Sequence, residues 1–155
     1  MRYVLLSILF FILSLVADFL ISPVFRLGSA KPEFLLLFVY FISFYWGRWY
    51  GLAYGFISGF LLDLHNPETL GMRIVVFTTI GYFLQEYNDR FYRFRSTSLL
   101  LLLGASIFYH LFLIIFSPLP FSFFFTRGLP SSFLNLLFAY PVFIFVGMRK
   151  SRDEV

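Results

Sequence analysis

The sequence predicts an all-α integral membrane protein built as a six-helix bundle, and three observations support this prediction. Hydrophobic residues make up 60% of the 155-residue chain and charged residues only 13%, whereas soluble domains contain about 45–50% apolar and about 25% charged residues. The apolar residues gather in runs that suit membrane helices. The basic residues fall between these runs, as membrane topology requires. At this length we expect a single transmembrane domain, residues 1–155.

Six apolar segments are predicted to cross the membrane, since a spanning helix needs about 20 mostly apolar residues. The run after Glu33 is too long for one span, and Gly47-Arg48-Trp49-Tyr50 divides it because Arg and Trp prefer the membrane interface. The predicted spans are residues 3–21, 34–46, 50–62, 70–84, 98–116 and 133–146. The second and third are each about 20 Å long, so a thinned bilayer or cover by neighbouring helices is needed.

Two shorter features complete this outline. The first apolar run has no small-x-small cleavage site, so we expect an uncleaved helix and not a signal peptide. Residues 121–125 are apolar but too few to cross, and we expect them to lie on the membrane surface.

The basic residues predict the orientation. Six spans place both termini on one side, and we predict that this side is the cytoplasm because most basic residues then lie inside. The inner segments would hold Arg2, Arg48, Arg90, Arg93, Arg95, Arg149, Lys150 and Arg152, and the outer segments Arg26, Lys31, Arg73 and Arg127. Topology therefore explains the net charge of +4 without a nucleic-acid partner. Arg90, Arg93 and Arg95 also suit contact with anionic membrane lipid or an acidic cytoplasmic protein.

A stripe of glycines is the clearest pattern inside the apolar runs. Gly51, Gly55, Gly59 and Asp63 are four residues apart and share one face of a helix. Small residues at this spacing let a second helix approach closely within a membrane. The second helix belongs either to the same bundle, which we favour for Gly55 and Gly59, or to a partner protein.

The few polar residues within the predicted spans have structural and functional interpretations. Asp18 and Asp63 are expected near the outer face, either as a proton- or ligand-binding acid pair or, as we favour, as carboxylates paired with a loop arginine such as Arg73. His110 suits a buried neutral imidazole better than a proton relay or metal ligand, and Asn135 suits a packing hydrogen bond. The chain has no cysteine and no catalytic or nucleotide motif, so we expect no enzyme activity, cofactor or metal.

These residues resemble the pattern of the rod shape-determining protein MreD family. The shared features are Pro32-Glu33, the run Gly55-Phe-Ile-Ser-Gly59-Phe-Leu-Leu-Asp63-Leu64, Leu70-Gly71 and Gly81-Tyr82, with weaker support from Asn135 and Pro141. Glu33 stands where the family more usually has Asp, which keeps the charge.

The resemblance implies a non-catalytic inner-membrane subunit of the bacterial cell-elongation (rod) complex, which supports cell shape and peptidoglycan synthesis. Its direct partner would be MreC, a bitopic periplasmic scaffold, with RodA, a class-B penicillin-binding protein and MreB as indirect partners. The implied fold is similar to the substrate-binding subunits of energy-coupling-factor transporters. An alternative follows from that likeness: a vitamin-type binding subunit of a transporter, with polar side chains converging beneath the outer loops. A lipid-modifying enzyme is a third hypothesis, but the sequence offers no catalytic constellation for it.

Overall fold

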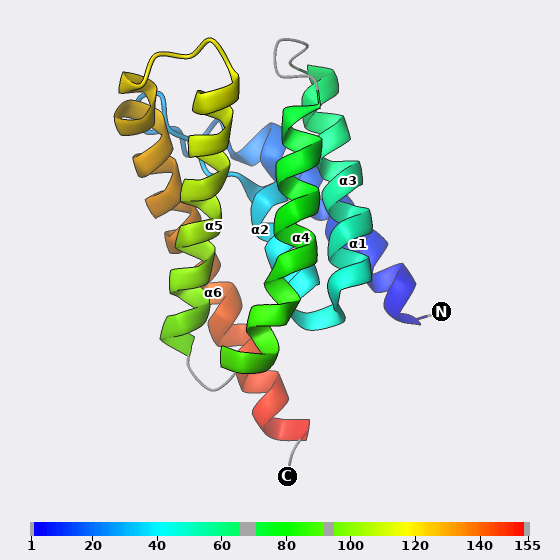
Figure 1. Cartoon of the computed structure of the whole chain (residues 1–155). Coiled ribbons are helices and arrows are strands. Elements are labelled where there is room, and N and C mark those ends of the chain that lie inside the picture. Colours follow the sequence, from blue (N-terminus) through cyan, green and yellow to red (C-terminus); the bar gives the residue numbers. More distant parts are fainter. Residues whose placement is uncertain (1, 66–70, 92–94, 154–155) are drawn as a thin grey trace.

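The computed structural model describes residues 2–65, 71–91 and 95–153, and within these ranges the chain forms a helical bundle (Figure 1). Two π-helical segments, η1 (Ala17–Ile21) and η3 (Phe124–Gly128), adjoin the first and last helices. The six α-helices are α1 (Arg2–Val16), α2 (Phe34–Trp46), α3 (Arg48–His65), α4 (Met72–Phe91), α5 (Arg95–Phe116) and α6 (Leu129–Asp153). The all-α, six-helix architecture expected from the sequence is therefore present.

The helix bounds differ in informative ways from the predicted segments. α2 covers the predicted 34–46, and α1 with η1 covers 3–21. Helices α3 and α6 extend past both predicted ends, α4 extends past its predicted carboxyl end and α5 past its predicted amino end, because polar residues at a helix end still form backbone hydrogen bonds. By length and composition, Val4–Ile21 and Thr97–Phe116 are long and apolar enough to cross a membrane, and Phe34–Trp46 and Met72–Leu84 are shorter apolar helices within the described ranges.

Helix α2 is the centre of the bundle. It is apolar on every side, the pattern of a helix buried on all faces, and the residues Leu35 to Tyr40 are all buried. It contacts each of the other five α-helices. Neighbouring helices therefore cover this 13-residue helix, which is one of the two ways expected for a helix too short to cross the bilayer alone.

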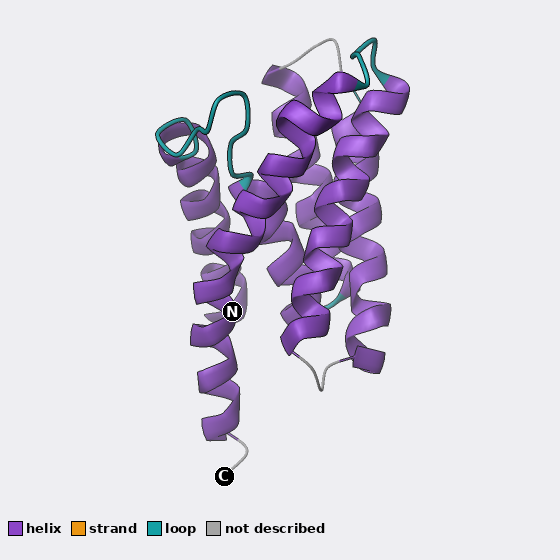
Figure 2. Ribbon diagram, turned by 90° about the vertical axis from the view of Figure 1, so that its left-hand side faces the viewer, coloured by secondary structure: helices purple, strands orange, loops and turns teal. Residues whose placement is uncertain are grey.

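A sharp turn separates α2 from α3 at the predicted position. Gly47 has φ +105°, which a residue with a side chain rarely adopts, and the chain reverses there. The longer described loops lie mainly at the opposite end of the bundle (Figure 2). We call this the loop end; it carries residues 22–33 and 117–121.

Residues 121–125 differ from the expectation of a separate surface segment. From Ser122 the backbone is helical and continues through η3 directly into α6. The wide π turn ends beside Pro130, which has no N–H to donate to a regular helix at this point. The last helical unit therefore starts about three turns earlier than the predicted residue 133.

Candidate functional site

The glycine stripe lies inside the bundle, in the contact between α3 and α4. A Cβ added at Gly55 would lie 2.5 Å from the Phe77 carbonyl oxygen, and one at Gly59 would lie 2.5 Å from the Ile74 Cα. Gly51 faces Gly81 so closely that neither position has room for a side chain. The stripe thus serves backbone-to-backbone packing of two helices of this chain and presents no free surface to a partner.

Asp63, at the end of that stripe, caps the next helix. Its side chain is 1% exposed, and Oδ2 accepts hydrogen bonds from the backbone N–H groups of Gly71 (2.9 Å) and Ile74 (3.2 Å). The first N–H groups of a helix have no partner within the helix, so Asp63 supplies one to α4 from outside. The arginine expected as its partner bonds elsewhere: Arg73 Nη1 donates to the Leu62 carbonyl at 2.8 Å.

Asp18 does the same for α2. It lies in η1, where the widened turn directs it toward the following loop, and Oδ1 accepts from the Phe34 N–H at 3.0 Å. Asp18 and Asp63, which precede α2 and α4 respectively, therefore each hold the start of the helix that follows. Because Asp18 and Asp63 accept hydrogen bonds from the backbone at the starts of different helices, they do not form an acid pair.

Asn135 and His110 meet at Glu33, a residue that the family resemblance singles out but composition does not. Asn135 is fully buried; its Oδ1 accepts from the Glu33 N–H at 2.7 Å and its Nδ2 donates to Ser106 Oγ at 2.9 Å. His110 is 4% exposed, with Nε2 3.6 Å from Glu33 Oε2. Gly128 packs against the His110 side chain, which lets η3 approach α5 at this level.

A small polar chamber lies at the loop end, and Asp18, Glu33 and Arg73 are among the residues that line it. Its volume is about 90 Å³, and its charged lining comes from four elements or loops. Lys31 and Glu33 precede α2, Asp18 lies in η1, Arg73 in α4 and Arg127 in η3. The remaining lining residues are Phe19, Leu35, Leu36, Leu62, His65, Phe77 and Tyr109. Polar side chains beneath the outer loops are expected only under the transporter alternative, and the sequence does not indicate that Lys31, Glu33 and Arg127 join Asp18 and Arg73 there.

The pKa of Glu33 is raised from 4.5 to about 7, chiefly because burial disfavours the charged carboxylate, while Arg127, Lys31 and Arg73 partly oppose the shift. A neutral Glu33 carries a proton that a neutral imidazole nitrogen can accept. His110 Nε2 lies 3.6 Å from Glu33 Oε2, and both atoms are buried without a hydrogen-bond partner in the described part of the chain.

This shift predicts that acid stabilises the fold. Between pH 4.5 and 7 the folded protein keeps the Glu33 proton while the unfolded chain releases it, so stability falls as the pH rises through this window. We expect a loss of about 3 kcal/mol, since each pKa unit corresponds to about 1.4 kcal/mol. The melting temperature of the protein in detergent, measured at each pH, reports this loss of stability. Glu33→Gln should flatten the profile, whereas Glu86→Gln, at an exposed carboxylate on α4, should not. An unchanged slope in Glu33→Gln would refute the assignment.

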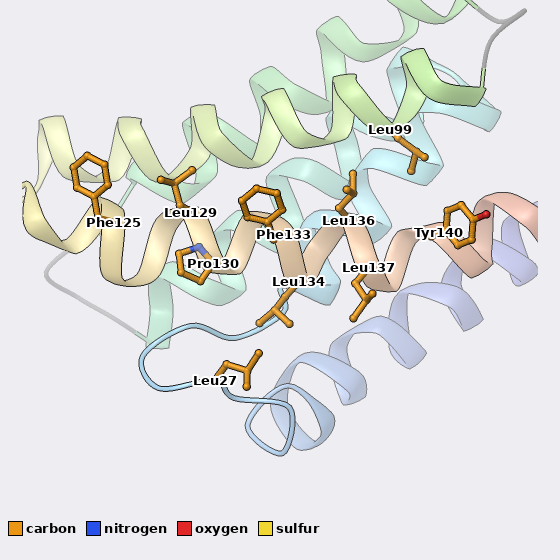
Figure 3. Close-up of a pocket in the computed structure, with 10 residues that line it drawn as sticks. All are labelled: Leu27, Leu99, Phe125, Leu129, Pro130, Phe133, Leu134, Leu136, Leu137 and Tyr140. Carbon is orange, nitrogen blue, oxygen red and sulfur yellow. The ribbon is translucent and has the colours of Figure 1, made fainter.

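A second kind of surface lies along α6. An apolar groove of about 710 Å³, which we call the α6 groove, runs along this helix (Figure 3). Figure 3 labels its lining as Leu27, Leu99, Phe125, Leu129, Pro130, Phe133, Leu134, Leu136, Leu137 and Tyr140. Another apolar groove, of about 680 Å³, lies between α4 and α5 and includes Phe83 and Phe108.

The remaining predicted residues form no site in the described part of the chain. Arg93 lies outside the described residues; Arg90 is in α4 and Arg95 begins α5, and their side chains are also outside the described part. No group of three His, Asp or Glu side chains suitable for a metal occurs among the described residues.

Comparison with known families decides the identity. The family model for rod shape-determining protein MreD matches residues 1–149, nearly the whole chain. The chain belongs to the MreD family. No curated protein and no solved structure matches it, so the expected likeness to energy-coupling-factor subunits stays a prediction.

Membership assigns the general role. A member of the MreD family is a non-catalytic, rod-shape-determining protein of the inner membrane. The apolar helices described above agree with that location. For an MreD-family protein, function then depends on what its surfaces bind.

Proposed function

We propose that this MreD-family protein is a membrane subunit of the rod complex that binds MreC directly, through the α6 groove. RodA, a class-B penicillin-binding protein and MreB would join indirectly through MreC. The observation that carries the proposal is the apolar, helix-length shape of the groove. The partner would contribute its membrane-spanning helix and the segment that follows it.

The groove suits a helix because its exposed residues repeat at helical spacing. Phe133, Leu137 and Tyr140 are 60%, 66% and 57% exposed, and their positions i, i+4 and i+7 place them on one face of α6. Helices that dock into grooves use such anchors. At the loop end, Leu27 and Phe125 continue the same surface, so a partner helix leaving the membrane would meet the loops there.

The glycine stripe is not available to a partner helix. Because Gly51, Gly55 and Gly59 are covered by α4, a partner helix has to bind a different face. The groove between α4 and α5 has a similar volume, but its lining includes Gly104, Thr79 and Thr97 and it does not reach the Leu27 loop. The α6 groove has more large anchors, which favours it as the contact.

The proposed topology places both termini in the cytoplasm and the loop end in the periplasm. In Figure 1, the amino end of α1 and the carboxyl end of α6 point toward the end of the bundle that carries the α2–α3 turn. Arg48 lies at that turn, with its guanidinium carbon 5.7 Å from the centre of the Tyr82 ring. Most basic residues then face the cytoplasm.

The transporter alternative receives limited support from the polar chamber. Polar groups do converge beneath the loops, as that hypothesis requires. The chamber holds about 90 Å³, however, whereas sites for small molecules usually measure about 300–1,000 Å³. A vitamin would not fit without a large rearrangement, so MreC binding is the better supported function.

Co-purification with MreC tests the groove. We expect Phe133→Ala combined with Leu137→Ala to reduce the recovered MreC about tenfold or more, since removal of two buried anchors commonly costs about 1–2 kcal/mol each. The matched control is Phe83→Ala with Phe108→Ala in the groove between α4 and α5, which should leave the yield unchanged. If both double variants were folded and recovered the same amount of MreC, the α6 groove would be excluded as the MreC contact.

A further inference from the structure

Three basic side chains from three parts of the chain meet at the polar chamber. Lys31 comes from the loop before α2, Arg73 from the first turn of α4 and Arg127 from η3. The chamber also contains the carboxyl groups of Asp18 and Glu33, so basic groups outnumber acidic ones even when both carboxyls are ionised. The side chains of Lys31, Arg73 and Arg127 are partly buried, and a partly desolvated excess of positive charge is unfavourable unless something compensates it.

The nearby carboxylates do not neutralise these cations by direct contact. Among the described residues, the contact between a chamber carboxyl group and a basic side chain joins Glu33 Oε2 to His110 Nε2 at 3.6 Å, and Asp18 Oδ1 accepts a hydrogen bond from the α2 backbone. The Arg73 head group donates one hydrogen bond to a carbonyl, and its Nε is buried without an acceptor. Donors therefore remain for a further acceptor inside the chamber.

Membrane topology does not explain why Lys31, Arg73 and Arg127 lie at the loop end. On the proposed topology, four basic residues lie in outer segments, where basic residues are disfavoured. Three of the four line this one chamber, and the fourth, Arg26, is exposed and bonds to Gly28 of its own loop at 2.8 Å. A binding role accounts for their convergence.

We propose that the chamber binds one phosphate-type oxyanion, held by Lys31, Arg73 and Arg127. Arginine and lysine donors are the usual ligands of such groups, because charge-assisted hydrogen bonds to phosphate oxygens are strong. A volume of about 90 Å³ has room for one small oxyanion with a few waters, each of which needs about 10–15 Å³. The oxyanion is either free or the head group of a phospholipid at the membrane surface. This proposal does not depend on MreC binding.

Titration of the full-length, delipidated protein in detergent tests the free-anion source. Inorganic phosphate and sulfate, compared with chloride at constant ionic strength, should bind saturably and raise the melting temperature. Arg127→Gln and Lys31→Met should each weaken binding about tenfold, the effect of losing one charge-assisted contact of about 1.4 kcal/mol. Arg26→Gln, at an outer arginine that does not line the chamber, should bind as the wild type does.

Quantification of tightly retained phospholipid after detergent washing tests the lipid source. A lipid head group in the chamber predicts that the wild type and Arg26→Gln retain one phospholipid per protein, while Arg127→Gln and Lys31→Met lose it. Either saturable anion binding or this retained lipid supports the proposal when the chamber variants diminish it and the control does not. Wild-type protein with neither property, or with binding that the chamber variants leave intact, overturns it. Wild-type protein that lacks both properties overturns the proposal whether or not the variants fold, and Arg127→Gln and Lys31→Met each give the comparison if the other fails to fold.

Discussion

Gly55→Leu and Gly59→Leu are each expected to prevent the protein from folding. At both positions the opposing atoms are backbone atoms of α4, within 2.5 Å of an added Cβ, and a backbone cannot move aside as a flexible side chain can. Overpacking a core usually costs about 1–3 kcal/mol, and separating two helices along their contact costs more. The measurement is the fraction of monodisperse protein in detergent together with its melting temperature.

Gly104→Leu is the matched control for these glycine variants. Gly104 lies within α5, and a Cβ added there meets nothing within 4 Å. Loss of a helical glycine usually improves helix stability by about 0.5–1 kcal/mol, so this variant should melt at or slightly above the wild-type temperature. If Gly55→Leu protein were monodisperse and melted at the wild-type temperature, α3 and α4 would not be packed against each other at the glycine stripe.

Asp63→Leu is expected to produce the second largest loss, about 2–4 kcal/mol. The change leaves the N–H groups of Gly71 and Ile74 without their acceptor, and each buried unsatisfied group costs about 1–3 kcal/mol. Asp63→Asn retains a carbonyl acceptor and should lose about half as much, since hydrogen bonds to charged groups are about twice as strong. Thermal melting of the three proteins in one detergent gives the order.

Leu64→Ala serves as control for the Asp63 series. Leu64 is the next residue and is 60% exposed, so truncation there should change the melting temperature little. If Asp63→Leu melted with the wild type, the carboxylate would not be the cap of α4, and an ionic or ligand role for it would need to be reconsidered.

The sequence predicts the helices well because each depends on local composition. The break at Gly47 could be foreseen because a glycine and an interfacial arginine interrupt one long apolar run. The burial of α2 on every side follows from a helix that has no polar face. The close packing of α3 follows from the four-residue spacing of its glycines.

The site depends on relations between distant residues, which the sequence does not display. Asp18 and Arg127 line the same chamber although more than a hundred residues separate them. The partner of Asp63 is a backbone N–H, which has no sequence signature, so Arg73 was the more obvious expectation. The π-helical turn that directs Asp18 toward Phe34 also leaves no pattern in the residue types.

Site-specific photocrosslinking in living cells tests the central claim most directly. A photoreactive residue at Leu137, in the α6 groove, should crosslink to the membrane helix of MreC. The same residue at Phe108, in the groove between α4 and α5, or at Phe56, on the exposed face of α3, should not. MreC captured from Phe108 or Phe56 and absent from Leu137 would contradict the proposed contact.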